Sequence, residues 1–129
     1  MTLNVEVVSP ERVLYSGEAR VVICRTTDGE LAFLTDHAPL IGALGIGEVR
    51  IATDSGDDEV AAVHGGFVEV RDNRVIILSD VAELASQIDV ERARRAKQEA
   101  EQNARDENDT EAEAALRRAN VRLEVAGAS

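Results

Sequence analysis

Aromatic residues and cysteine are scarce in this chain of 129 residues. There is no tryptophan, and the aromatic residues are Tyr15, Phe33 and Phe67, so any core must be built mainly from Val, Ile, Leu and Ala. The one cysteine, Cys24, cannot form an internal disulfide, which excludes a disulfide-stapled scaffold and suits a reducing compartment. Cys24 falls within an alternating strand pattern, and we expect it to be a buried structural thiol.

Basic residues are outnumbered by acidic ones, and lysine occurs only once. The net charge of −11 argues against nucleic acid and against an anionic membrane surface as partners, because both bind clustered Lys and Arg. No apolar run approaches the ~20 residues that a membrane-spanning helix needs, so we expect no direct membrane insertion. The first residues lack a secretion signal pattern, which favours a cytoplasmic protein.

Residues 1–86 show the period-two alternation of half-buried strands. In the clearest stretch, a strand ends at the glycine pair 65–66, which indicates a bulge or a close backbone contact. A strand at 67–71 leads into the Asp-Asn pair at 72–73, which fits a type I′ turn because both residues tolerate positive φ. The next strand, 75–78, is apolar on both faces, and we expect it to be covered on both sides.

Short strands at regular spacing precede this stretch, and turn residues such as Asp28-Gly29 separate them. The expected strands cover residues 3–9, 13–15, 19–25, 31–34, 40–44 and 48–53. Many short strands of this kind predict a β-sandwich or a β-barrel.

Beyond residue 86 the hydrophobic period changes to 3.6, which indicates helices. Asp89 is a suitable N-cap for the first helix, because its carboxylate can accept hydrogen bonds from the free backbone N–H groups of the first turn. A second helix begins at Thr110, since Thr110 and Glu113 have the spacing of a capping box. Between the two helices lies a polar break over 103–109.

Each helix carries one stripe of small apolar residues. The stripes consist of Ala93, Ala96, Ala100 and Ala104 in the first helix and Ala112, Ala115, Leu116, Ala119, Leu123 and Ala126 in the second. We therefore predict an antiparallel αα-hairpin over residues 87–129. Its net charge is −2, compared with −9 for residues 1–86, so ion pairs should lace its surface. Alanine faces bury little apolar area, and we expect the hairpin to be held weakly and to detach.

Groups that could perform catalysis are few. The two histidines, His37 and His64, do not form the close His-x-His pair of a barrel metal site, and neither lies near Cys24 to activate its thiol. No Gly-Lys-Ser/Thr sequence follows the glycines at 42–47, which excludes a phosphate-binding loop. We expect structural or interface roles for both histidines, and a binding or structural module rather than an enzyme.

Three segments match one known family in order and spacing over essentially the whole chain. Residues 29–40, from Gly-Glu-Leu to His-Ala-Pro-Leu, resemble the pattern G-E-L-G-I-x-P-G-H-A-P-L. Residues 65–80 resemble G-G-x-x-E-V…N-x-V-x-V-L-A-D, and further matches follow at 82–83, 88–93 and 116–123. Together these segments resemble the epsilon subunit of bacterial F-type ATP synthase.

The resemblance implies an α+β fold, with an N-terminal β-sandwich of about ten strands at 1–86 and a C-terminal antiparallel two-helix hairpin at 87–129. It implies a non-catalytic central-stalk rotor subunit of the proton-transporting ATP synthase, which couples proton flow to ATP synthesis and needs no cofactor. The sandwich would bind the gamma subunit and the rotor ring of c subunits. The hairpin would lie on the sandwich or extend to the alpha and beta subunits, where it inhibits ATP hydrolysis. Such a subunit is peripheral, on the cytoplasmic side of the bacterial plasma membrane.

By the same resemblance, the loop after residue 30 faces the rotor ring. This assigns the ring contacts to Glu30, Leu34 and His37. The loop departs from the family pattern at three positions, where Ala32, Thr35 and Asp36 replace Gly, Pro and Gly.

The segment 88–93 matches the I/L-D-x-x-R-A motif through which some members of the family bind regulatory ATP, with or without Mg²⁺. The ATP-binding residues implied are Glu83, Ile88, Asp89, Arg92, Ala93, Arg118 and Arg122. A carboxylate can accept from the adenine amino group or a ribose hydroxyl, and arginines can donate to phosphates.

Three observations favour a simpler reading of the same segment. Asp89 is also an ordinary helix N-cap, Arg92 could pair with a helix carboxylate, and Glu99 adds a negative charge to the first helix. The alternative to a rotor subunit is a stand-alone nucleotide-binding regulatory module.

Overall fold

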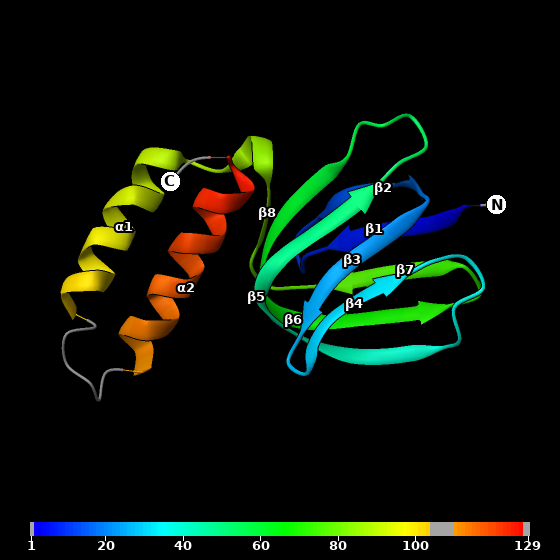
Figure 1. Ribbon diagram of the computed structural model, residues 1–129, viewed down its shortest axis with the longest axis horizontal. Coiled ribbons are helices and arrows are strands. Elements are labelled where there is room, and N and C mark those ends of the chain that lie inside the picture. The colour runs from blue at the N-terminus through cyan, green and yellow to red at the C-terminus, as the bar shows by residue number, and fades with distance from the viewer. Residues whose placement is uncertain (1, 104–109, 128–129) are drawn as a thin grey trace.

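A strand-rich part and a helical part follow one another in the computed structural model, which describes residues 2–103 and 110–127 (Figure 1). The strands of these residues are β1 Leu3–Val8, β2 Val13–Ala19, β3 Val21–Thr26, β4 Gly29–Phe33, β5 Leu40–Ala52, β6 Glu59–Arg71, β7 Arg74–Leu78 and β8 Ala82–Leu84. A 3₁₀ turn, η1 Ala85–Gln87, and two helices, α1 Val90–Asn103 and α2 Thr110–Val125, complete them. The predicted α+β class, a sandwich followed by two helices, is confirmed.

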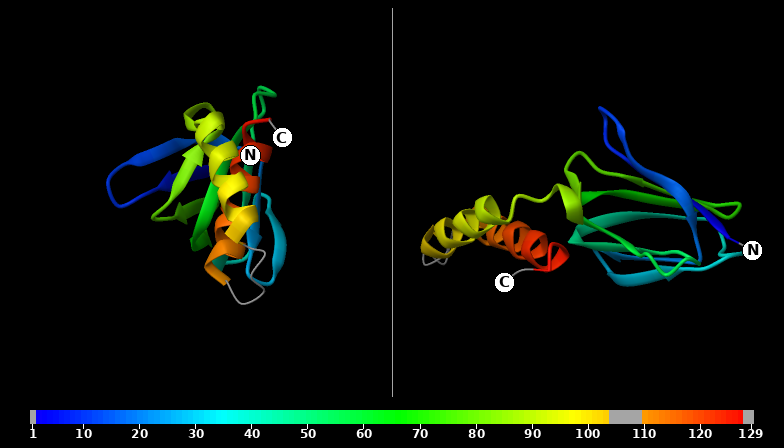
Figure 2. Two further views of the ribbon diagram at one scale, coloured as in Figure 1. Left: turned by 90° about the vertical axis from the view of Figure 1, so that its left-hand side faces the viewer. Right: turned by 90° about the horizontal axis from the view of Figure 1, so that it is seen from above.

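The strands form one continuous sheet that folds over itself into two layers (Figure 1 and Figure 2). Its order is β2-β1-β7-β6-β5-β3-β4, and β8 pairs with β6 beside this path. All neighbours are antiparallel except β1 and β7, which are parallel. β5 and β6 have 13 residues each, and this length lets both strands contribute to both layers.

β5 and β6 pass from one layer to the other at a corner formed by Gly45, Gly65 and Gly66, where their pairing register is interrupted. Gly65 and Gly66 have φ of +87° and +117°, which residues with side chains rarely adopt. A Cβ on Gly66 would lie 2.0 Å from the carbonyl oxygen of Leu78, so the backbones of β6 and β7 meet closely there. The close backbone contact predicted at 65–66 is therefore confirmed.

Eight strands are present in the described part of the chain, compared with about ten expected. The sequence predicts separate strands at 40–44 and 48–53, but they run together through Gly45 as β5. The strand predicted to end at 65–66 likewise continues to Arg71 as β6. A glycine corner bends a strand without ending it, and its composition resembles that of a turn.

Alternate residues of both layers point inward and form one core. The buried members are Leu3, Val5, Val7, Ala19, Val22, Cys24, Phe33, Leu44, Val49, Ile51, Ala61, Val63, Val68, Val70, Val75 and Ile77. Cys24 is completely buried, as predicted. Burial raises the pKa of its thiol to about 11, and the negative charge of Glu30 adds to the shift.

β7 is buried on one face only. Val75 and Ile77 are completely buried, but Ile76 is half-buried and Leu78 is 46% exposed. The prediction that this strand is covered on both sides is therefore wrong. The two helices lie beside the other layer, so the second apolar face of β7 stays open (Figure 1).

The turn between β6 and β7 has the predicted type I′ form, since Asp72 and Asn73 have φ of +51° and +59°. The side-chain oxygen of Asn73 also accepts a hydrogen bond from the backbone N–H of Asp36 at 2.6 Å. The loop between β4 and β5 is therefore tied to this turn.

The two helices pack antiparallel through their small residues. Of the predicted stripes, Ala93, Ala100, Ala112, Ala119 and Leu123 are buried, Ala115, Leu116 and Ala126 are partly buried, and Ala96 is exposed. α2 lies between α1 and the sandwich and packs on β5 and β6 (Figure 1). The polar break predicted at 103–109 falls, apart from its first residue, outside the described residues, as does the stripe residue at 104.

Candidate functional site

A cleft of about 370 Å³ lies where η1 leads into α1, between β8 and α2. It is lined by Val81, Glu83, Gln87, Asp89, Arg92, Ala93, Ala96 and Arg122. Its volume is within the range of small-ligand sites, roughly 300–1,000 Å³. The cleft brings together five of the seven residues predicted for ATP: Glu83, Asp89, Arg92, Ala93 and Arg122.

Asp89 caps α1. Its Oδ1 accepts a hydrogen bond from the backbone N–H of Arg92 at 3.1 Å, and its carbonyl oxygen accepts from the N–H of Ala93 at 3.0 Å. The predicted N-cap is confirmed. Only Oδ1 of the carboxylate is engaged among the described residues, so capping and a ligand contact through Oδ2 are compatible.

Glu83 and Arg122 form an ion pair between the sandwich and the hairpin. Nε of Arg122 on α2 donates to Oε1 of Glu83 on β8 at 2.5 Å, and the two side chains are 26% and 29% exposed. Because both groups are mostly shielded, this pair is less screened by water than an ordinary surface pair. A phosphate that recruited Arg122 would have to draw the guanidinium away from Glu83.

The other predicted ATP residues are placed differently. Arg92 is exposed and makes no ion pair within residues 2–103 and 110–127, so the helix-carboxylate pairing considered for it is not observed. Arg118 pairs with Glu111 at 2.6 Å and does not line the cleft. Ile88 closes η1 through a hydrogen bond from its N–H to the carbonyl oxygen of Ala85 and is also outside the lining.

The donor set of the cleft fits a nucleotide. The carboxylate of Asp89 can accept from an amino or hydroxyl group, and the guanidinium of Arg92 is available for phosphate oxygens. Glu99 lines a separate cavity between α1 and α2, so its negative charge is not part of this cleft. No group of three or more His, Cys, Asp or Glu side chains in the described residues could hold a metal ion.

The residues predicted to contact the rotor ring lie at two places. Leu34, 56% exposed, and His37 belong to the loop that is tied to the β6–β7 turn, and the His37 ring packs edge-on against Phe33 at 5.0 Å. Glu30 lies near the opposite end of β4, where it lines a cleft of about 500 Å³ together with Arg117 and other residues of α2. Leu34 is four residue steps along the chain from Glu30, about 13 Å at 3.3 Å per step in an extended strand.

An exposed apolar face runs across β5, β6 and β7 on the layer that the helices leave open. Ile41 is 76% exposed, Phe67 58% and Leu78 46%. The strand register places Phe67 between Ala43 and Leu78. In the next row Glu69 lies between Ile41 and Ile76. We call this surface, Ile41, Ala43, Phe67, Ile76 and Leu78, the open face. This surface was not predicted from the sequence, although the continuous apolar run at 75–78 was a signal for it.

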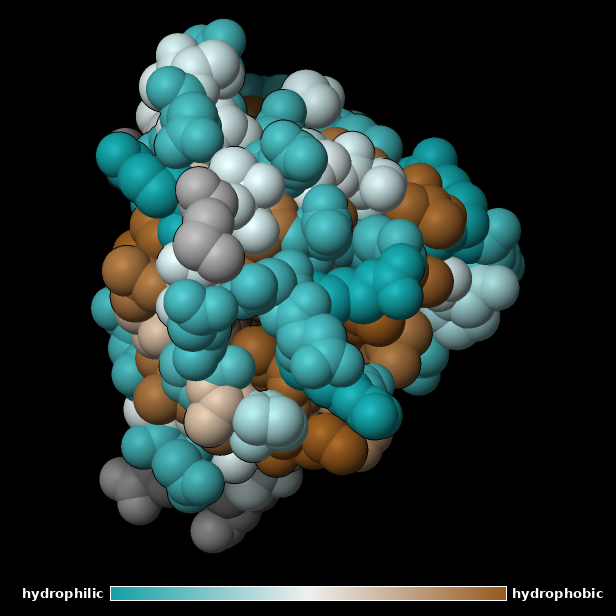
Figure 3. Space-filling model, turned by 90° about the vertical axis from the view of Figure 1, so that its right-hand side faces the viewer, coloured by the Kyte–Doolittle hydropathy of each residue, from teal (hydrophilic) through white to brown (hydrophobic). Residues whose placement is uncertain are grey.

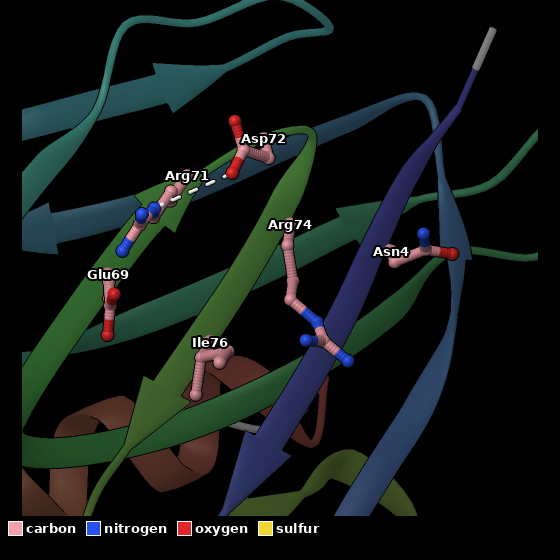
Figure 4. Close-up of a pocket in the computed structure, with 6 residues that line it drawn as sticks. All are labelled: Asn4, Glu69, Arg71, Asp72, Arg74 and Ile76. Atoms are coloured by element: carbon pink, nitrogen blue, oxygen red, sulfur yellow. Dashed lines mark ion pairs between the residues drawn. The ribbon is translucent and has the colours of Figure 1, made fainter.

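A shallow cavity of about 520 Å³ adjoins the open face. It is lined by Asn4, Glu69, Arg71, Asp72, Arg74 and Ile76 (Figure 4). Arg71 and Asp72 form an ion pair at 3.5 Å, and both side chains are largely exposed. None of the predicted site residues lines this cavity, and its paired charges form a polar border beside the open face.

From the end of the molecule opposite the hairpin, hydrophobic side chains appear as separate patches between hydrophilic ones (Figure 3). No helix among the described residues is long and apolar enough to span a membrane.

Two family models match the chain and together cover nearly all of it. Residues 2–85 match the beta-sandwich domain of the ATP synthase Delta/Epsilon chain, and residues 86–127 match its long alpha-helix domain. The ATP synthase epsilon chain of Halalkalibacterium halodurans is 50% identical over 131 residues, which cover 98% of each chain. That of Streptomyces avermitilis is 44% identical over 126 residues, covering 98% of this chain and 96% of the relative.

Solved structures show the same fold. A chain of the Euglena gracilis mitochondrial ATP synthase, described as OSCP/F1/c-ring, has a TM-score of 0.73 at 20% identity and covers 98% of this chain and 78% of its own. One from Tetrahymena thermophila, described as central stalk and c-ring, has a TM-score of 0.55 at 18% identity and covers 73% and 71%. The chain therefore belongs to the ATP synthase epsilon chain family, a non-catalytic subunit of that enzyme complex.

Proposed function

We propose that the chain is a central-stalk subunit of a bacterial F-type ATP synthase, which binds the gamma subunit and the ring of c subunits and helps to couple proton flow to ATP synthesis. The open face is the observation that supports this proposal. Ile41 and Phe67 are more than half exposed, and contiguous apolar surface of this kind marks a protein-binding site. A solved structure with this fold is described as central stalk and c-ring.

The two partners fit two different surfaces. The gamma subunit covers the open face, where apolar side chains are bordered by paired charges, as in protein–protein interfaces. The ring of c subunits contacts the loop that carries Leu34 and His37. With these partners the subunit is peripheral on the cytoplasmic side of the plasma membrane.

Co-expression with gamma and the c ring tests this assignment. The chain should co-purify with both, Ile41→Asp should lose gamma while keeping its fold, and Leu34→Asp should lose only the ring. Glu18→Gln, an exposed change on β2, is the control that keeps both partners. A folded chain that binds neither partner would contradict the proposal.

We further propose that the hairpin regulates the enzyme by leaving the sandwich and extending to the alpha and beta subunits, where it inhibits ATP hydrolysis. α1 and α2 meet mainly through alanines, and Glu83–Arg122 is the ion pair between hairpin and sandwich in the described residues. Small apolar contacts of this kind stabilise a docked element only modestly.

In this proposal, ATP bound in the cleft favours the docked hairpin. The cleft is built by both parts of the chain, with Glu83 from the sandwich and Asp89, Arg92 and Arg122 from the hairpin. A ligand held by both parts binds the docked form alone, so it shifts the population toward that form by its differential affinity.

Isothermal titration with ATP, with and without Mg²⁺, tests the cleft. Arg92→Ala should abolish binding, while Arg95→Ala, an exposed arginine of α1 outside the cleft, should leave it unchanged. Asp89→Asn separates the two roles of this residue, because an amide still caps the helix but carries no charge. Absence of binding at millimolar ATP would rule out ATP as a regulator of this chain, but it would not contradict its assignment as a rotor subunit. If the chain binds ATP but does not bind the gamma subunit, it is instead a stand-alone nucleotide-binding regulatory module.

A further inference from the structure

His64 lies on β6 just before the glycine corner, on the side of the strand that α2 covers. Ala61 and Val63 point into the core, so Ala62 and His64 point to the opposite face, and Ala62 is completely buried there. α2 packs on β5 and β6 at this level. The docked hairpin therefore helps to enclose the imidazole.

Both ring nitrogens of His64 are buried, and neither makes a hydrogen bond with any described residue. A neutral imidazole carries one N–H donor and one acceptor, so two polar atoms are left without partners. Buried polar atoms without partners are rare, because each costs about 1–3 kcal/mol. The docked structure therefore encloses both ring nitrogens without a protein partner in the described part of the chain.

Charged groups surround His64 from three elements. Arg118 and Arg122 face it from α2, and Glu83 faces it from β8. Asp80, in the β7–β8 connection, lines a cavity of about 430 Å³ together with His64, Phe67 and Leu78. Burial, together with the positive charges of Arg122 and Arg118, lowers the pKa of His64 to about 4, and the negative charge of Glu83 acts in the opposite direction. The docked structure therefore disfavours a second proton on the ring.

We propose that the hairpin docks on the sandwich only when His64 is neutral, so that acidification releases the hairpin. This inference rests on the mobile hairpin of the proposed function and adds the proton as its regulator. A protonated ring would be a cation without hydrogen-bond acceptors beside two arginines. It would also compete with Arg122 for Glu83 and so weaken the ion pair that joins hairpin and sandwich.

The pH range follows from the two states of the histidine. In the released state the ring is solvated and titrates near its ordinary pKa of 6.5. The docked state binds fewer protons than the released state. The equilibrium constant for docking is therefore independent of pH above about 6.5 and decreases as the pH falls toward 4. Within this interval the equilibrium constant for docking decreases by at most about tenfold per pH unit.

Distance measurement by resonance energy transfer in the full-length chain tests the proposal. Dyes are attached at Asp57→Cys, in the exposed β5–β6 loop, and at Glu101→Cys, on the exposed side of α1, while Cys24 is buried and unlabelled. Between pH 7.5 and 5.0 the transfer efficiency should fall. His64→Gln should remove this response, and His37→Gln, in an exposed loop, should preserve it. The proposal is overturned if the wild type does not respond, or if His64→Gln responds like the wild type.

A further variant separates this inference from the proposed function. Glu83→Gln breaks the inter-domain ion pair and should lower the transfer efficiency at every pH. If Glu83→Gln moves the hairpin but a change of pH does not, protonation does not control docking, while the proposal that the hairpin is mobile is supported. If neither moves it, both ideas fail. Should His64→Gln not fold, a nuclear magnetic resonance titration of the two histidines in the wild type replaces it, and a His64 that titrates near 6.5 in a docked chain would overturn the proposal.

Discussion

The open face gives the most quantitative prediction about partner binding. We consider replacement of both Ile41 and Phe67 by serine. Complete burial of an Ile or Phe side chain is worth about 1.5–3 kcal/mol. Ile41 is 76% exposed and Phe67 58% exposed, so a partner that covers both recovers about 2–4 kcal/mol. The double variant should therefore bind gamma about 30- to 700-fold more weakly.

The same change should have little effect on folding. Both side chains point away from the core, and exposed substitutions usually alter the free energy of unfolding by less than about 1 kcal/mol. Affinity is measured by titration against purified gamma, and stability is measured by urea unfolding of the free chain. Val13→Ser is the matched control, because Val13 is 55% exposed on the edge strand β2 and lies outside the open face.

Two results would refute this reasoning. Unchanged affinity of a folded double variant would show that gamma binds elsewhere. An equal loss of affinity in Val13→Ser would show that general surface hydrophobicity, and not the open face, drives binding.

Three further predictions concern the sandwich and the start of α1. Gly66→Ala should lower the free energy of unfolding by more than about 3 kcal/mol, because its Cβ would clash with the carbonyl oxygen of Leu78. Gly56→Ala is the control, since φ is also positive there but the surrounding space is open, and it should cost only about 1 kcal/mol. Both values are measured by urea unfolding. The raised pKa of Cys24 means that the folded chain keeps a proton that the unfolded chain loses, so stability should fall as the pH rises from about 9 to 11; Cys24→Ala should show a smaller decline. Asp89→Ala should cost about 1 kcal/mol and speed amide exchange in the first turn of α1, and Asp89→Asn should restore both; equal behaviour of the two variants would exclude the capping bond.

Local features were predictable from the sequence. The type I′ turn at Asp72-Asn73 depends on two adjacent residues, and the N-cap at Asp89 depends on one side chain and the next turn of backbone. Alternation in the strands and alanine spacing in the helices placed Cys24 and the small residues of the hairpin inside. Each of these features is determined within a few residues, and short-range patterns contain that information.

Features that depend on distant segments were not predictable in this way. β5 bends through Gly45 and remains one strand because β3 and β6 continue to pair with it. The face of β7 that carries Leu78 is open because the helices pack on the other layer. Of the predicted ATP residues, Arg118 is held away from the cleft by Glu111, seven residues earlier on α2. The hydrophobic pattern of each segment alone is compatible with either outcome.

The glycine corner lies between two surfaces of β5 and β6, the open face and the surface that the hairpin covers. On one side of Gly65 and Gly66, β6 presents Phe67 to the open face, and on the other side it presents His64 to the hairpin. Phe67 and His64 nevertheless line one cavity of about 430 Å³, so a partner that covers Phe67 comes close to the surface that the hairpin covers. The close approach of Gly66 to the Leu78 carbonyl fixes the relative orientation of the two surfaces. A side chain at Gly66 should thus disturb partner binding and hairpin docking together. Phe67→Ser should weaken partner binding alone, and His64→Gln should remove only the pH response of the hairpin.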